Sequence, residues 1–116
     1  MVEHLNENNF KSSLSNLDLA AVDFWAEWCA PCRAISPVLE EFEKKVGGNL
    51  KLFKVDIDKN PSLASEYGVE SIPTILIFKK GMPVDSLAVG LTSKREIEEK
   101  LKSAIKTNGK NYINKK

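Results

Sequence analysis

Cysteine, histidine and net charge are all scarce in this sequence. Its 116 residues include two cysteines and one histidine, and 17 basic residues nearly balance 16 acidic ones. Because the charges are so nearly balanced, there is no electrostatic basis for binding nucleic acid or an anionic membrane. No apolar run approaches the roughly 20 residues that cross a bilayer, and the first ten residues do not resemble a signal peptide. We therefore expect one monomeric, cytoplasmic domain that binds neither nucleic acid nor membrane.

The two cysteines, Cys29 and Cys32, are separated by only two residues. A disulfide between them would close too short a loop to add much stability through chain entropy. Small secreted domains that depend on disulfides usually carry four or more cysteines. The pair could also be half of a zinc site, but such sites usually need four ligands and the one histidine is His4, which we expect at the surface. The two cysteines could also be inert residues of the core, but their spacing favours a chemical role.

Apolar periodicity predicts strands and helices that alternate along the chain. Strands are expected at residues 1–5, 19–25, 50–56, 74–78 and 84–89, and helices at 10–17, 29–46, 62–67 and 93–105. Strand–helix–strand units indicate right-handed parallel crossovers, and a turn at 79–82 makes the last two strands a hairpin. The sequence therefore predicts an α/β fold, a central mixed β-sheet flanked by helices on both faces. We expect a domain over residues 1–106 and a flexible, basic tail over 107–116.

Cys29 lies where a strand that ends at Trp25 gives way to a helix. Pro31 suits the first turn of that helix, because its missing N–H is not needed there. Free backbone N–H groups and the positive end of the helix dipole would then face the Cys29 sulfur. Both would lower the pKa of Cys29 and favour the thiolate, the form that attacks disulfides. Cys32 would lie one turn further on, deeper and within reach of that sulfur.

The cysteine segment Trp28-Cys-Ala-Pro-Cys32, which follows Val22-Asp-Phe-Trp-Ala-Glu27, resembles the active site of the thioredoxin family. The resemblance extends over nearly the whole chain through Pro37, Val55–Asp58, Asn60-Pro61, Ile72-Pro73-Thr74, Gly81 and Gly90. One departure is Ala30, where thioredoxins most often have glycine. The resemblance implies the thioredoxin fold and a protein-disulfide reductase that binds no cofactor or metal. It also implies a reversible Cys29–Cys32 disulfide, disulfide-containing client proteins and a thioredoxin reductase as partner.

The resemblance also implies roles for individual residues. Cys29 would be the nucleophile and Cys32 the resolving residue. Ile72-Pro73 would be a cis peptide beside the cysteines, and the Ile72 backbone could pair with an extended substrate strand. The apolar surface around the exposed sulfur would bind the substrate and consist of Trp28, Ala30, Pro31, Ile72, Pro73 and Gly90.

Asp23 is unusual because it interrupts an apolar strand, where a carboxylate is costly to bury. It could be a structural residue with a hydrogen-bond partner. The functional alternative, which the resemblance favours, is a proton acceptor for Cys32, since burial raises the pKa of a carboxyl towards neutral pH. Lys54, on the adjacent predicted strand, could reach Asp23 and modulate it.

Two rival functions use the same residues. A binding module would use the apolar surface to hold one partner, with redox cycling incidental. An oxidant or isomerase would run the exchange in the opposite direction. Trapping separates the first rival, because a Cys32→Ser variant of an exchange enzyme accumulates mixed disulfides with many clients. The equilibrium potential against glutathione separates the second.

Overall fold

The computed structural model describes residues 2–87 and 93–108. Within these residues, five strands form one sheet in the order β1-β3-β2-β4-β5. The strands are β1 (Glu3–His4), β2 (Ala20–Trp25), β3 (Lys51–Asp56), β4 (Thr74–Lys79) and β5 (Met82–Leu87). The helices are α1 (Phe10–Leu14), α2 (Ala30–Val46), the 3-10 turn η1 (Gly47–Asn49), α3 (Pro61–Glu66) and α4 (Lys94–Asn108).

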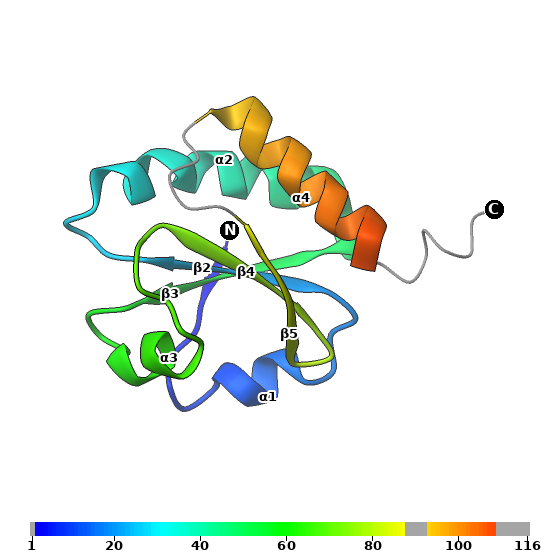
Figure 1. Cartoon of the computed structure of the whole chain (residues 1–116). Helices are drawn as coiled ribbons and strands as arrows, with labels where there is room; N and C mark the ends of the chain where they lie inside the picture. Colours follow the sequence, from blue (N-terminus) through cyan, green and yellow to red (C-terminus); the bar gives the residue numbers. More distant parts are fainter. Residues whose placement is uncertain (1, 88–92, 109–116) are drawn as a thin grey trace.

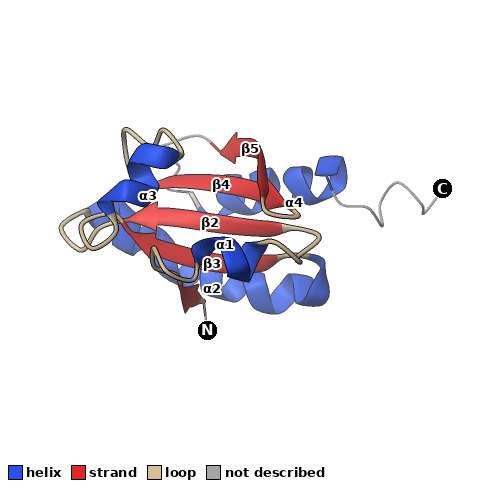
Figure 2. Ribbon diagram, turned by 90° about the horizontal axis from the view of Figure 1, so that it is seen from below, coloured by secondary structure: helices blue, strands red, loops and turns tan. Residues whose placement is uncertain are grey.

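The helices cover the sheet in two layers. In Figure 1, α2 and α4 lie on one face of the sheet and α1 and α3 on the other. Figure 2 views the molecule from the α1 side, with α1 and α3 in front of the strands. This arrangement confirms the predicted α/β class and the mixed sheet with helices on both faces.

The connection between β3 and β4 differs from the prediction. β2 and β3 pair in parallel through α2, but β4 pairs antiparallel with β2, so this unit is not a parallel crossover. The α3 helix between them has six residues and is about 9 Å long, roughly half the length of a six-residue strand. Gly68, with φ 67°, then turns the chain back at the helix end. β4 therefore begins at the end of the sheet where β3 stops, with Thr74 beside Phe24.

The strand β2 lies at the centre of the sheet and is buried on both faces, as predicted. Its side chains alternate, so neighbouring residues belong to different cores. Ala21 packs in the core beneath α2 and α4, which also contains Ile35, Leu39 and Leu101. Val22 and Phe24 pack in the core beneath α1 and α3, which also contains Phe10, Leu14 and Phe78. Asp23, between Val22 and Phe24, therefore points towards α2 and α4.

Several element ends differ from the sequence prediction, among them the end of α1, which stops at Leu14 and not at residue 17. β5 begins at Met82, two residues earlier than predicted, and positions 88 and 89 lie outside the described residues. At the start of α4, the Ser93 Oγ accepts a hydrogen bond from the Glu96 N–H at 3.2 Å and so caps the first turn. The helix runs to Asn108, so the first two residues of the predicted tail are helical, and 109–116 lie outside the described part.

Candidate active site

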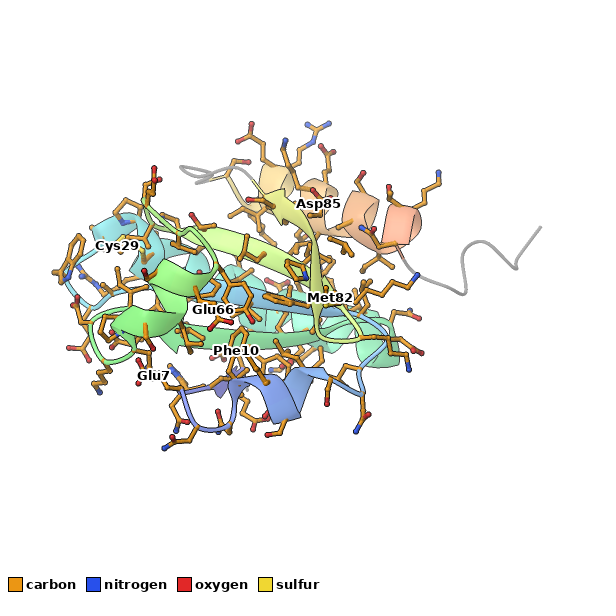
Figure 3. The ribbon with its side chains drawn as sticks, turned by 60° about the horizontal axis from the view of Figure 1, so that its bottom comes forward. Glu7, Phe10, Cys29, Glu66, Met82 and Asp85 are labelled. Carbon is orange, nitrogen blue, oxygen red and sulfur yellow. A yellow bond between two sulfur atoms is a disulfide. The ribbon has the colours of Figure 1, made fainter. Side chains whose placement is uncertain are left out.

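The two cysteines form a disulfide at the start of α2. Cys29 is the N-cap of the helix, and Pro31 lies in its first turn, as predicted. The Cys32 N–H donates a hydrogen bond to the Cys29 Sγ at 3.2 Å, and the two Cα atoms are 5.3 Å apart. The buried strand β2 ends four residues earlier and holds this helix end at one end of the molecule, where Figure 3 labels Cys29. The sulfur of Cys29 thus lies against the backbone donors of the first helical turn.

The burial of the cysteines corrects one expectation. Cys32 is fully buried, as predicted, and Cys29 as a residue is only 4% exposed, so Cys29 is less exposed than expected. Both cysteines belong with Ala26 to a small buried cluster, and Trp25, Ile57 and Ile72 pack against that cluster. Segments distant in sequence therefore contribute to the burial. Cys29 is nevertheless the only one of the two with any surface open to a partner.

The residues expected to bind substrate differ in how far they are exposed to solvent. Trp28 is 67% exposed, and its indole Nε1 donates a hydrogen bond to the Asp58 Oδ2 at 2.8 Å. Ala30 and Pro31 are exposed, Ile72 is half-buried and Pro73 is buried. The Ile72-Pro73 peptide bond is cis, which confirms that expectation, and Gly90 lies outside the described residues. An exposed indole therefore lies next to Cys29 in the chain, held in place by a carboxylate that the sequence did not point to.

Asp23 is fully buried, and neither carboxylate oxygen has a hydrogen-bond partner among the described residues. The purely structural interpretation required such a partner. Burial raises the pKa of Asp23 to about 7, although the positive charge of Lys54 acts in the opposite direction. A carboxyl group with this pKa can exchange protons near neutral pH.

Lys54 is the register partner of Asp23 on β3, and it is 8% exposed. Its ammonium donates a hydrogen bond to the Ser36 Oγ and lies 4.5 Å from the ring centroid of Trp25. Lys54 therefore acts on Asp23 through its charge and makes no hydrogen bond to it. The sequence analysis missed Ser36. Its signal was a polar residue on the apolar face of α2, four residues after Cys32.

His4 lies on the edge strand β1 and is exposed, as expected. Its ring contacts the Trp25 ring edge-on, with centroids 5.9 Å apart. Burial and then the charge of Lys54 lower the pKa of His4. Across residues 2–87 and 93–108, no three or more His, Cys, Asp or Glu side chains gather as a metal site would need, and no helix there could span a membrane.

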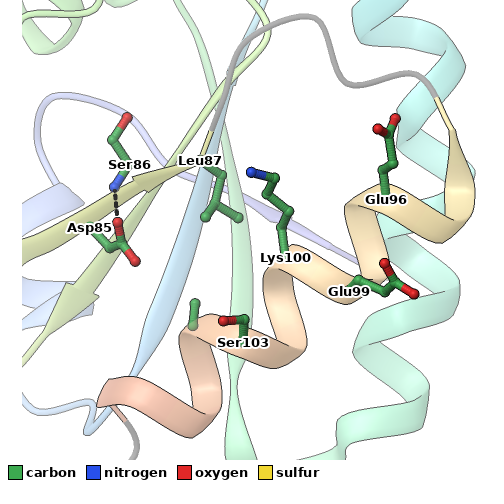
Figure 4. Close-up of a pocket in the computed structure, with 8 residues that line it drawn as sticks. Asp85, Ser86, Leu87, Glu96, Glu99, Lys100 and Ser103 are labelled. Atoms are coloured by element: carbon green, nitrogen blue, oxygen red, sulfur yellow. Dashed lines mark hydrogen bonds between the residues drawn. The ribbon is translucent and has the colours of Figure 1, made fainter.

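A surface groove lies away from the cysteines. It has a volume of about 560 Å³ between β5 and α4, and Figure 4 shows its lining of Asp85, Ser86, Leu87, Glu96, Glu99, Lys100, Ser103 and Ala104. None of these residues belongs to the cluster around the cysteines. Figure 3 accordingly shows Asp85 well away from Cys29.

A disulfide at a helix N-terminus, above a buried carboxyl on a mixed sheet, is the arrangement of a thiol–disulfide oxidoreductase. The Thioredoxin family model matches residues 1–103 of this chain. Thioredoxin from Rickettsia felis is 40% identical over 106 residues, 90% of this chain and 100% of that protein. Thioredoxin from Porphyra purpurea is 41% identical over 105 residues, 90% of this chain and 97% of that one. The structure of a thioredoxin mutant from Halobacterium salinarum matches with a TM-score of 0.76 and 30% identity, over 87% of this chain and 88% of that one. The chain belongs to the thioredoxin family and is a thiol–disulfide oxidoreductase.

Proposed function

We propose that this protein reduces disulfides in client proteins of the cytoplasm, with Cys29 as nucleophile and Cys32 as resolving residue. The observation that carries the assignment is the difference in exposure between the two cysteine residues. Cys29 retains a small exposed surface at the helix N-terminus, whereas Cys32 has none. A client disulfide can therefore meet Cys29 first, and Cys32 can react only with Cys29.

The reaction proceeds in two exchanges. The Cys29 thiolate attacks one client sulfur, the client disulfide breaks, and the other client sulfur leaves as a thiolate that takes up a proton. Cys32 then transfers its proton to Asp23, and its thiolate attacks Cys29 in the mixed disulfide. The client gains two electrons and leaves reduced, and the chain keeps the Cys29–Cys32 disulfide. A thioredoxin reductase returns two electrons to restore the dithiol.

The client is held by apolar surface and backbone around Cys29. Trp28, Ala30 and Pro31 offer exposed side chains, and Trp28 is oriented by its hydrogen bond to Asp58. The backbone at Ile72 pairs with an extended client segment, a form of strand addition. Such pairing uses hydrogen bonds to the client main chain and does not depend on the client's side chains. The buried Pro73 forms the cis peptide that follows Ile72, and Gly90, which the family resemblance adds to this surface, lies outside the described residues. Such recognition suits an enzyme that acts on many different clients.

The experiment is covalent trapping. The Cys32→Ser variant should accumulate mixed disulfides with several client proteins, which a small-molecule dithiol releases. The matched Cys29→Ser variant should trap none. Non-covalent capture of one partner by both variants would instead identify a binding module. The equilibrium potential against glutathione tests direction, because a strongly reducing value fits a reductase and an oxidising value contradicts it.

A further inference from the structure

A buried ammonium and a buried carboxyl group lie side by side in the sheet without pairing. Asp23 and Lys54 are register partners on parallel strands, which lie about 4.8 Å apart, so their side chains project from the same face. Asp23 is fully buried and Lys54 is 8% exposed. Buried charges of opposite sign normally pair, because each is costly alone. Both oxygens of Asp23 nevertheless lack a hydrogen-bond partner within the described residues.

The ammonium of Lys54 is held by the helix instead of by the carboxyl group. It donates to the Ser36 Oγ on α2 and lies over the Trp25 ring at 4.5 Å from the centroid. Ser36 follows Cys32 by four residues, so both lie on the same side of α2. One helix therefore carries the resolving cysteine and also positions the charge nearest in register to Asp23.

The groups that face Asp23 leave Lys54 as the decisive charge. From β4 the register partner is Ile75, which is apolar. From α2, Ser36 contacts the Lys54 ammonium, and Cys32 lies one turn earlier on the same side of that helix. From β3 this face of the sheet presents Lys54 and then Asp56, whose Oδ1 accepts the backbone N–H groups of residues 58 and 59. Within the described chain, Lys54 is the charged group that shifts the pKa of Asp23. Burial is the larger influence on this pKa, and the position of the Lys54 ammonium sets how strongly it is opposed.

We propose that Ser36 is a positioning residue that holds the Lys54 ammonium against α2 and so leaves Asp23 unpaired and able to accept the proton of Cys32. The ammonium has three donors and no acceptor. Without the Ser36 hydroxyl, the unpartnered oxygens of Asp23 become the acceptors to which it turns. An ion pair would stabilise the ionised carboxyl group and make Asp23 a weaker base. This inference rests on the proton transfer proposed above.

The test is Ser36→Ala in the otherwise unchanged protein. Carboxyl ¹³C chemical shifts of the oxidised form, followed against pH, give the midpoint at which Asp23 ionises. We expect this midpoint to fall by about one pH unit or more. The pH midpoint for resolution of a mixed disulfide by Cys32, measured by stopped flow, should fall by the same amount. Alanine favours a helix, so the variant should fold.

Two matched variants isolate the hydroxyl. Ser36→Thr keeps the acceptor and should leave both midpoints at their original pH. Ser36→Ala combined with Lys54→Met should match Lys54→Met alone, because there is no ammonium left to position. An unchanged Asp23 midpoint in Ser36→Ala, or an equal change in the Lys54→Met background, overturns the positioning role. A shifted Asp23 midpoint with an unshifted resolution profile supports the positioning of Lys54 but overturns Asp23 as the proton acceptor.

Discussion

The cores on the two faces of the central sheet differ in the kinds of side chain that they bury. Beneath α1 and α3 the core is built from aromatic rings, with Phe10 between Phe24 and Phe78 at centroid distances of 6.5 and 5.5 Å. Beneath α2 the end of the sheet near the cysteines contains the unpartnered carboxyl group of Asp23 and the unpartnered indole N–H of Trp25, as far as the structure is described. Unpartnered buried polar groups are rare, and they reduce stability. Apolar packing stabilises both faces, and the α2 face gives up part of this stability at the end where the chemistry takes place.

The side chains of β2 point alternately to the two faces of the sheet, so substitutions at neighbouring residues can test this contrast. Val22 and Phe24 enter the aromatic core, whereas Asp23 points towards the redox helix. Because adjacent positions belong to opposite faces, substitutions one residue apart should separate stability from exchange. Figure 3 shows the same separation in space, with Phe10 beside α1 and Cys29 at the end of the molecule.

The largest effect is expected from Cys29→Ser. Disulfide reduction should fall to the uncatalysed rate, because a serine hydroxyl cannot form a mixed disulfide and Cys32 is fully buried. The stability of the reduced form should change little, since sulfur and oxygen are similar in size. The measurements are turnover of a protein disulfide and urea unfolding under reducing conditions. Turnover by Cys29→Ser at more than background would show that Cys32 can attack clients directly.

On the aromatic face, Phe24→Ala should lower the free energy of unfolding by about 3–5 kcal/mol. The ring is fully buried among Phe10 and its neighbours, so its removal leaves a cavity. Exchange per folded molecule should remain close to the original rate. Urea unfolding of the oxidised protein measures the first effect, and stopped flow below the unfolding midpoint measures the second. Phe24→Leu, which fills more of the space, is the control and should cost less.

This distinction between faces could be partly predicted from sequence. The apolar run around Val22 indicates a strand buried on both sides, and its single carboxylate marks Asp23 as unusual. A strand that ends at Trp25 and a proline at position 31 together place Cys29 at the start of a helix. These are local patterns, and the structure confirms each placement.

What could not be predicted depends on contacts between distant segments. Periodicity reports which residues share a face but not the direction of a strand, so the antiparallel β4 was missed. The buried cluster that contains Cys29 is packed against Ile57 and Ile72, about 30 and 40 residues further along the chain. The Lys54–Ser36 hydrogen bond likewise joins β3 to α2. Local sequence gives no account of such packing.

On the redox face, Asp23→Asn should make the oxidised protein as stable or more stable at neutral pH. The carboxyl pKa is raised from 3.8 to about 7, so between these values the folded chain binds more protons than the unfolded one. Stability therefore falls as pH rises from about 4 to about 7, and the full penalty is present above this range. Asparagine removes this dependence and keeps the size of the side chain.

The same variant should slow the resolution of the mixed disulfide, because asparagine cannot accept the proton of Cys32. The first attack, by Cys29, should be nearly unchanged. Urea midpoints of both proteins at several pH values test the stability claim, and stopped flow separates the two exchange steps. If the Asn variant were less stable at neutral pH and resolved at the original rate, Asp23 would be a structural residue and the contrast between the two faces would fail.

The smallest effect is expected from Ala30→Gly, which tests whether the contrast extends to the protein surface. Ala30 begins α2 and is exposed, so its methyl group lies in neither core. The substitution mainly alters backbone freedom, worth about 0.4–1 kcal/mol. For a two-electron couple 30 mV corresponds to about 1.4 kcal/mol, and stiffening acts on both redox forms, so the potential should shift by no more than roughly 20 mV. Equilibration with glutathione, followed by separation of the oxidised and reduced forms, measures the shift. A value several times larger would mean that position 30 acts on the sulfur electrostatics, and the chemistry would then depend on the helix end as strongly as on the buried charges beneath it.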